Sequence, residues 1–104
     1  MESEATSGSR IVEFRQNLER VSSEEETSEL FQSFVCETVG DFVGRDPGDL
    51  DGAEKAIDYG VDSLMAVEFV NELEQIGIDI PLDPILSETL DDLAELLRKV
   101  YEGG

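Results

Sequence analysis

Apolar residues recur at intervals of three and four in three separate stretches of this 104-residue chain. This spacing predicts amphipathic helices with one side turned to a core, and no stretch shows the alternation typical of a strand. The first long helix is expected at 24–43, because Ser23 and Glu26 form a capping-box pattern and Gly44 suits a C-terminal cap. A chain of this length fits one small domain, so the helices are expected to share one core.

Two further helices complete the expected core. The second is expected from Ser63 to Ile76, where Gly77 ends it, and the last follows Thr89 as its N-cap. Pro81 and Pro84 restrict the segment between these helices to an extended entry and one short helical turn.

A long ordered loop is predicted at 45–59, since this segment is interrupted by proline and glycine. The residues expected to anchor it on the core are Leu50, Ala53, Ile57 and Tyr59. The predicted fold class is therefore all-α, a small helical bundle of three principal helices plus a short helix before the last, with a long loop between the first and the second.

The two ends of the chain are expected to differ from the bundle. Residues 1–9 are small and polar and are predicted to be a disordered N-terminal segment. Residues 10–22 form an amphipathic linker or an extra short helix, which either docks on the bundle or precedes it as a tail. The main domain is expected at 23–101, followed by a frayed tail at 102–104.

The charge balance is strongly acidic, with 26 Asp and Glu residues against 7 Lys and Arg and a net charge of −19. No Lys or Arg lies between Ala56 and Leu97. Such a field repels nucleic acid and anionic membranes and favours partners with basic surfaces. The start of the chain carries no signal-peptide pattern and no stretch has transmembrane length, so a cytoplasmic protein is expected.

The sequence offers few side chains for catalysis. It contains no histidine and a single cysteine, Cys36, which is predicted to be a structural thiol beside the core. A nucleophilic serine enzyme would lack its usual base, and a metal site would lack its usual ligands, so neither is expected.

The second predicted helix has two distinct faces. Five apolar residues at helical spacing define a face turned to the core, namely Ala66, Phe69, Val70, Leu73 and Ile76. The opposite stripe is expected to be exposed and consists of Leu64, Val67, Glu68, Asn71, Glu72, Glu74 and Gln75. Exposed aliphatic residues edged by carboxylates are typical of a docking surface. Helix physics leaves two roles open for Ser63: it caps the helix, or Asp62 does so and the Ser63 hydroxyl points to solvent.

The nonapeptide Gly60-Val61-Asp62-Ser63-Leu64-Met65-Ala66-Val67-Glu68 resembles the phosphopantetheine-attachment motif of acyl carrier proteins, in the form most similar to carrier domains of polyketide synthases. The similarity extends over residues 24–101 and implies the acyl-carrier-protein fold. It also implies that Ser63 carries 4′-phosphopantetheine, installed from coenzyme A by a phosphopantetheinyl transferase, and that acyl chains are held as thioesters.

The resemblance further implies a non-catalytic carrier, monomeric as an isolated domain. Its partners would be the transferase, a ketosynthase, an acyltransferase and other synthase domains with basic docking surfaces. The residues implied in partner recognition are Asp62, Leu64, Met65, Val67, Glu68, Asn71 and Glu72.

Two departures from the family pattern leave alternatives open. Val70-Asn71 stands where polyketide carriers commonly have Arg-Asn, and the segment after Pro81 lacks the usual Phe-x-x-Pro-Thr pattern. The parent system is therefore a multidomain synthase or a free-standing carrier. A peptidyl or fatty-acid carrier, or an acidic helical interaction module without a prosthetic group, are the competing interpretations.

Overall fold

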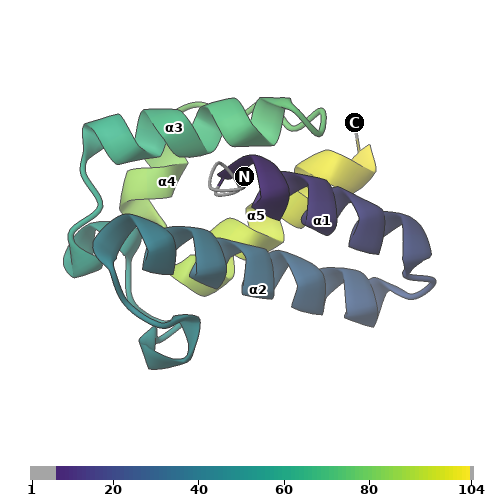
Figure 1. Ribbon diagram of the computed structural model, residues 1–104, viewed down its shortest axis with the longest axis horizontal. Coiled ribbons are helices and arrows are strands. Elements are labelled where there is room, and N and C mark those ends of the chain that lie inside the picture. The colour runs from purple at the N-terminus through teal and green to yellow at the C-terminus, as the bar shows by residue number, and fades with distance from the viewer. Residues whose placement is uncertain (1–6, 104) are drawn as a thin grey trace.

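The structure, a computed structural model, describes residues 7–103 as a bundle of α-helices joined by short turns and one long loop (Figure 1). The helices are α1 (Ser7–Arg20), α2 (Glu24–Val43), α3 (Ser63–Glu74), α4 (Asp83–Ser87) and α5 (Leu90–Gly103), with short 3₁₀ turns η2 (Pro47–Asp49) and η3 (Ala56–Tyr59) in the loop. No strand forms within this part of the chain, where a single isolated antiparallel bridge pairs Lys55 with Thr89. The predicted all-α fold class is confirmed.

Local capping explains where α2 begins and ends, and both ends fall where the sequence predicts them. The Ser23 hydroxyl accepts a hydrogen bond from the Glu26 N–H at 3.2 Å, and the Glu26 carboxylate accepts one from the Ser22 N–H at 3.3 Å. At the other end Gly44 adopts φ 75°, a left-handed conformation in which glycine has no steric penalty.

The capping residues predicted from the sequence also mark the starts of the later helices. The Thr89 hydroxyl accepts a hydrogen bond from the Asp92 N–H at 3.1 Å and so caps α5. Helix α3 begins at Ser63 as predicted and ends at Glu74, two residues early, before a turn in which Gly77 has φ 84°. The segment between Pro81 and α5 forms the short α4.

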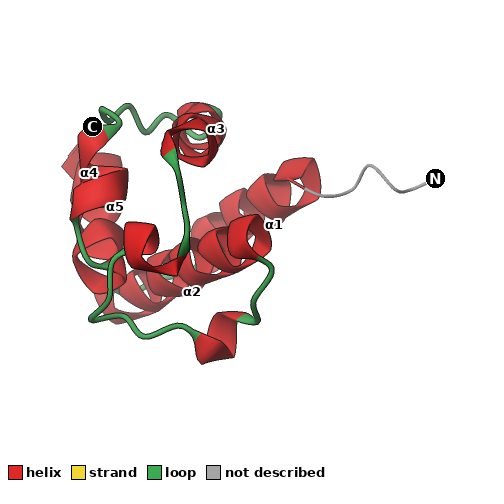
Figure 2. Ribbon diagram, turned by 90° about the vertical axis from the view of Figure 1, so that its left-hand side faces the viewer, coloured by secondary structure: helices red, strands yellow, loops and turns green. Residues whose placement is uncertain are grey.

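The N-terminal helix α1 docks on the bundle, which answers the question left open for residues 10–22. Its apolar side, Ile11, Phe14 and Leu18, is buried in the common core. Figure 2 shows α1 beside α2 and on one side of α3, with α4 and α5 on the other side. An isolated helix of this length is marginal in water, so this packing is what stabilises it.

The helices extend further at both ends than the sequence predicts. Helix α1 already includes residues 7–9, which were expected to be disordered, while residues 1–6 lie outside the described residues. Helix α5 continues to Gly103 instead of fraying at 102, and an ion pair of 2.9 Å between the Arg98 Nη1 and the Glu102 Oε1 supports its last turn. Gly104 is also outside the described range.

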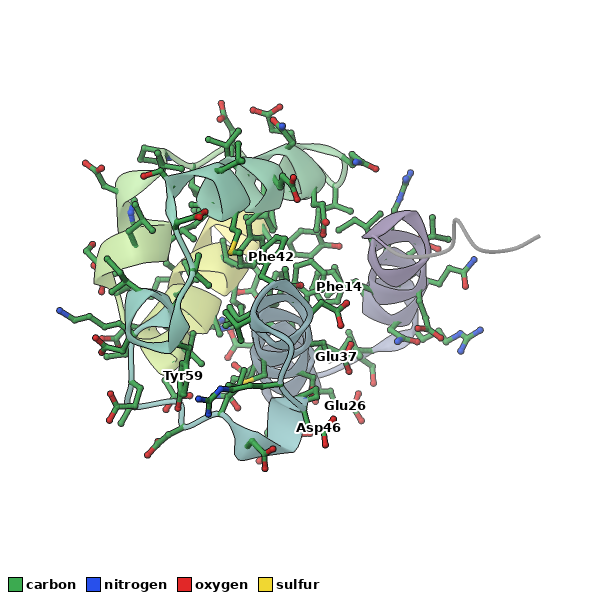
Figure 3. All side chains as sticks on the ribbon, turned by 60° about the vertical axis from the view of Figure 1, so that its left-hand side comes forward. Phe14, Glu26, Glu37, Phe42, Asp46 and Tyr59 are labelled. Carbon is green, nitrogen blue, oxygen red and sulfur yellow. The ribbon has the colours of Figure 1, made fainter. Side chains whose placement is uncertain are left out.

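The long loop is fixed to the start of α5. The Asp91 N–H donates to the Gly52 carbonyl at 3.0 Å, and the Leu90 N–H donates to the Glu54 carbonyl at 2.9 Å. Tyr59 accepts a hydrogen bond from the Asp51 N–H at 2.7 Å through its phenolic oxygen. Figure 3 shows Tyr59 on the side of the bundle away from α1. These contacts hold the segment that leads into α3.

Two of the four predicted loop anchors are wrong. Leu50 and Tyr59 pack against the core, but Ala53 and Ile57 are exposed. Ala56 and Val61 are the buried residues here, because the 3₁₀ turn directs Ala56 inward and its neighbour Ile57 outward.

Candidate functional site

The start of α3 leaves the Ser63 hydroxyl free. Asp62 is the N-cap, with extended backbone, and its Oδ1 accepts a hydrogen bond from the Met65 N–H at 2.9 Å. Ser63 is the first residue of the helix and is exposed, and its hydroxyl makes no hydrogen bond to the described residues. Of the two roles left open by the sequence, capping therefore belongs to Asp62.

Ser63 is held in place by buried residues on both sides of it. Gly60 adopts φ 112° and reverses the chain after η3, and the Val61 N–H donates to the Ala56 carbonyl at 3.2 Å. Val61 before the serine and Ala66 after it are both buried in the core. A reactive group on Ser63 would therefore be presented from a fixed backbone rather than from a flexible loop.

Most of the predicted recognition residues lie on the exposed surface of α3. Leu64 is 71% exposed and Val67 is 43% exposed. Glu68 and Asn71 are exposed as well, whereas Met65 is half-buried and packs against the core. The helix thus brings Ser63, Leu64, Val67, Glu68 and Asn71 to one accessible surface.

Glu72 is the exception, and its predicted exposure is wrong. The side chain is only 6% exposed, so it is unavailable to a docking partner. Its position on the helix lies between the core-facing residues and the outer stripe, on the same side as the half-buried Met65 and Ile76. The sequence pattern of α3 alone carries no information about which helices pack beside it.

Ile57 was missed by the sequence reasoning, which assigned it to the core. It is 51% exposed and lies in the turn that precedes Ser63. The available signal was that Lys55 and Asp58 flank the pair Ala56-Ile57 in a segment without helical periodicity, so that the smaller Ala56 could equally well take the inner position.

The described residues contain few other side chains that could be reactive or bind a metal ion. Burial raises the pKa of the Cys36 thiol, and the carboxylates of Asp91 and Glu37 raise it further. Within residues 7–103 no three metal-binding side chains gather into a candidate site. None of the helices in that range combines the length and the apolarity needed to cross a bilayer.

The described residues thus form a helical bundle with an exposed serine at the start of α3 and acidic side chains around it. The class of protein, a carrier of a prosthetic group, follows from the comparison with known families. Residues 33–97 match the family described as "Phosphopantetheine attachment site", and the chain belongs to this family. The family is defined by a covalently attached 4′-phosphopantetheine group, so the predicted family and cofactor are confirmed.

Two curated relatives support this assignment. The chain is 32% identical over 91 residues to "Orsellinic acid synthase ArmB" of Armillaria ostoyae, a match that covers 88% of this chain and 4% of that protein. It is 30% identical over 69 residues to "Orsellinic acid synthase armB" of Armillaria mellea, covering 66% of this chain and 3% of that protein. The chain therefore spans a small fraction of the length of these relatives. No solved structure matches it significantly.

Proposed function

We propose that this chain is an acyl carrier domain of polyketide biosynthesis and that Ser63 is the point where 4′-phosphopantetheine is attached. The observation that carries the proposal is the free, exposed Ser63 hydroxyl at the first position of α3, with Asp62 supplying the cap in its place. Both residues belong to the motif that resembles the attachment sequence of acyl carrier proteins.

The local structure suits a phosphodiester on Ser63. The first N–H groups of a helix have no partner within the helix, and its N-terminus carries a partial positive charge. Ser63 and Leu64 are the first two residues of α3, and the end of a helix where their N–H groups lie would favour an anion such as a phosphate on the Ser63 oxygen. When bound, the prosthetic group supplies a terminal thiol that holds acyl chains as thioesters.

The role of the protein itself is delivery rather than catalysis. The whole chain lacks histidine, so Ser63 has no neighbouring base of the usual kind. Tethering an acyl group to a docked carrier raises its local concentration at the active site of each partner.

The acidic side chains around Ser63 are complementary in charge to basic surfaces, which supports the proposal that the partners dock through such surfaces. These are a phosphopantetheinyl transferase and then a ketosynthase, an acyltransferase and other domains of a synthase. The recognition residues that remain accessible, in whole or in part, are Asp62, Leu64, Met65, Val67, Glu68 and Asn71. The printed names of the two relatives and the motif Asp-Ser-Leu-Met-Ala-Val-Glu support the polyketide pathway. The proposal places the chain in the cytoplasm and makes it a monomer as an isolated domain.

The test is the intact mass of the protein after incubation with coenzyme A, magnesium and a broad-specificity phosphopantetheinyl transferase. Wild type and Ser33→Ala, which alters an exposed serine of α2, should both gain the mass of one phosphopantetheine. Ser63→Ala should gain none. A folded wild type that gains no mass would contradict the proposal and favour an acidic interaction module.

A further inference from the structure

Two helices flank the helix that begins at Ser63. Helix α3 packs most closely against α1 and α4, whereas α2 packs mainly against α5. Figure 2 shows α1 on one side of α3, and α4 with α5 on the other side. The position of α3 in the bundle is therefore set in part by α1, the helix nearest the start of the chain.

Phenylalanine rings connect α1 to α3. The ring of Phe14 in α1 stacks on the ring of Phe34 in α2, and the Phe34 ring forms a T-shaped pair with Phe69 of α3. Phe69 is fully buried and forms a second T-shaped pair with Phe42, with ring centroids 6.3 Å apart. Because protein interiors are close-packed, loss of the Phe14 ring would leave one face of Phe34 without contacts, and Phe34 could then move away from Phe69.

The attachment of α1 depends on few side chains. Within residues 11–20 only Ile11, Phe14 and Leu18 are buried. The seam between α1 and α2 is hollowed, with adjoining cavities of about 90 and 430 Å³ that share Asn17 and Leu30 in their linings. An element held by few buried apolar contacts opens at a low free energy, so a change at Phe14 should act first on the docking of α1.

The similarity to known proteins continues into α1. The family match at residues 33–97 leaves α1 outside it. The match to the Armillaria ostoyae synthase, however, covers 91 of the 104 residues, so at most 13 residues precede it and it begins no later than Phe14. The second half of α1 therefore belongs to the stretch that this chain has in common with a longer synthase, although it lies outside the part that defines the family.

We infer that Phe14 is a positioning residue for the carrier site. The docked α1, acting through Phe34 and Phe69, holds α3 in the position from which Ser63 is presented to the enzyme that modifies it. When α3 is loosened, only a fraction of the molecules present Ser63 correctly at any time, and the apparent affinity for that enzyme falls by the same fraction. This inference rests on the proposed carrier function and adds to it a residue outside the part of the chain that defines the family.

The experiment measures KM and kcat separately for transfer of phosphopantetheine from coenzyme A by the broad-specificity transferase, with the full chain as the varied substrate. Phe14→Leu, which removes the ring but keeps an apolar side chain, is compared with Ala94→Gly. Ala94 is buried in α5, which packs against α2, so its substitution destabilises the fold away from the ring contacts of Phe14. We expect Phe14→Leu to raise KM about threefold with kcat unchanged, and Ala94→Gly to change neither.

Amide hydrogen exchange followed by NMR gives a readout that does not depend on loading. We expect Phe14→Leu to speed exchange in α3, from Phe69 to Leu73, and to leave exchange in α5 as it is in wild type, because the change loosens one helix and not the whole fold. Ala94→Gly should not speed exchange in α3 more than in α5. Thermal melts verify that each variant is folded, and Phe14→Met takes the place of Phe14→Leu if that variant does not fold.

The outcomes separate this inference from the proposed function. A wild type that is loaded, with Phe14→Leu at the wild-type KM or with both variants raising KM equally, would overturn the positioning role and leave the carrier function intact. Uniformly faster exchange throughout the Phe14→Leu protein would also overturn it, since this would show a loss of general stability alone. Wild type that is never loaded would overturn the proposed function, and with it the role assigned to Phe14.

Discussion

The ring of Phe14 in α1 stacks face to face on the ring of Phe34 in α2, with centroids 4.1 Å apart and planes 8° from parallel. Phe14 also forms a T-shaped pair with Phe31, with ring centroids 5.0 Å apart, and Phe34 in turn forms one with Phe69 of α3 at 5.9 Å. In Figure 3 the labelled Phe14 points from α1 into the bundle. The N-terminal helix is therefore part of the aromatic core that supports the functional helix.

Substitution of Phe14 tests whether α1 belongs to the cooperative unit. We expect Phe14→Ala to lower the free energy of unfolding by about 3–5 kcal/mol, as truncation of a buried phenylalanine does. Val12→Ala on the outer side of the same helix should change it by less than about 0.5 kcal/mol. Denaturant unfolding followed by circular dichroism measures both. Equal stability of the two variants would show that α1 is only loosely attached.

Gly40 lies where α2 meets the turn that follows it. A Cβ at this position would stand 2.6 Å from the Arg45 carbonyl oxygen, and the Arg45 N–H donates to the Gly40 carbonyl at 2.9 Å, so the turn cannot easily move away. Alanine gains about 1 kcal/mol in helix propensity, but overpacking costs about 1–3 kcal/mol.

Gly40→Ala is therefore expected to lower the melting temperature despite its better helix propensity. The control is Gly48→Ala, because a Cβ there would meet no atom within 4 Å. A Gly40→Ala protein that melts above wild type would mean that the turn relaxes at little cost.

Because the pKa of Cys36 is raised, its thiol is predicted to react slowly with alkylating reagents. Burial is the main cause, and Asp91 and Glu37 add to it. In the unfolded chain the Cys36 thiol ionises at its ordinary pKa, which is lower than its pKa in the folded protein. The contribution of this thiol to the free energy of unfolding is therefore fully present below the ordinary pKa, and it is lost as pH rises from there toward the folded pKa. Alkylation by iodoacetamide at mildly alkaline pH should be slower for the folded protein than for the chain in urea, and faster in Asp91→Asn than in wild type. A folded protein that reacts as fast as the unfolded chain would contradict the prediction.

Charge reversal on the exposed face of α3 tests the electrostatic part of recognition. Glu68→Lys should slow loading by the transferase by about tenfold at low salt, and the loss should shrink as ionic strength rises. Glu19→Lys makes the same change in charge on the exposed side of α1 and should have little effect. Because both residues are exposed, neither variant should lose stability, and a large drop in melting temperature for Glu68→Lys would show that its side chain packs in the fold.

The ends of the helices could be predicted from the sequence wherever interactions between residues close along the chain determine them. The ends of α2 follow from Ser23 and Gly44, and the start of α5 follows from Thr89, because each cap is formed by residues a few positions apart. The start of α3 at Ser63 was predicted for the same reason, although only the structure shows that Asp62 is the cap.

The errors arise where distant segments meet. Glu72 is polar and falls on the expected outer stripe, yet it is buried in a bundle where α3 packs against both α1 and α4. Ile57 is apolar and was expected in the core, yet the 3₁₀ turn gives the inner position to Ala56. Neither outcome can be obtained from the periodicity of one helix or the composition of one loop.

The central claim is that Ser63 bears the prosthetic group, and the most direct test is to locate the group on the loaded protein. Peptides of the loaded protein should be fragmented by a method that keeps the phosphodiester intact, so that the added mass can be assigned to one residue. The account predicts that the fragments place this mass on Ser63 and leave Ser33, Ser87 and Cys36 unmodified. Assignment of the mass to any other residue would contradict it.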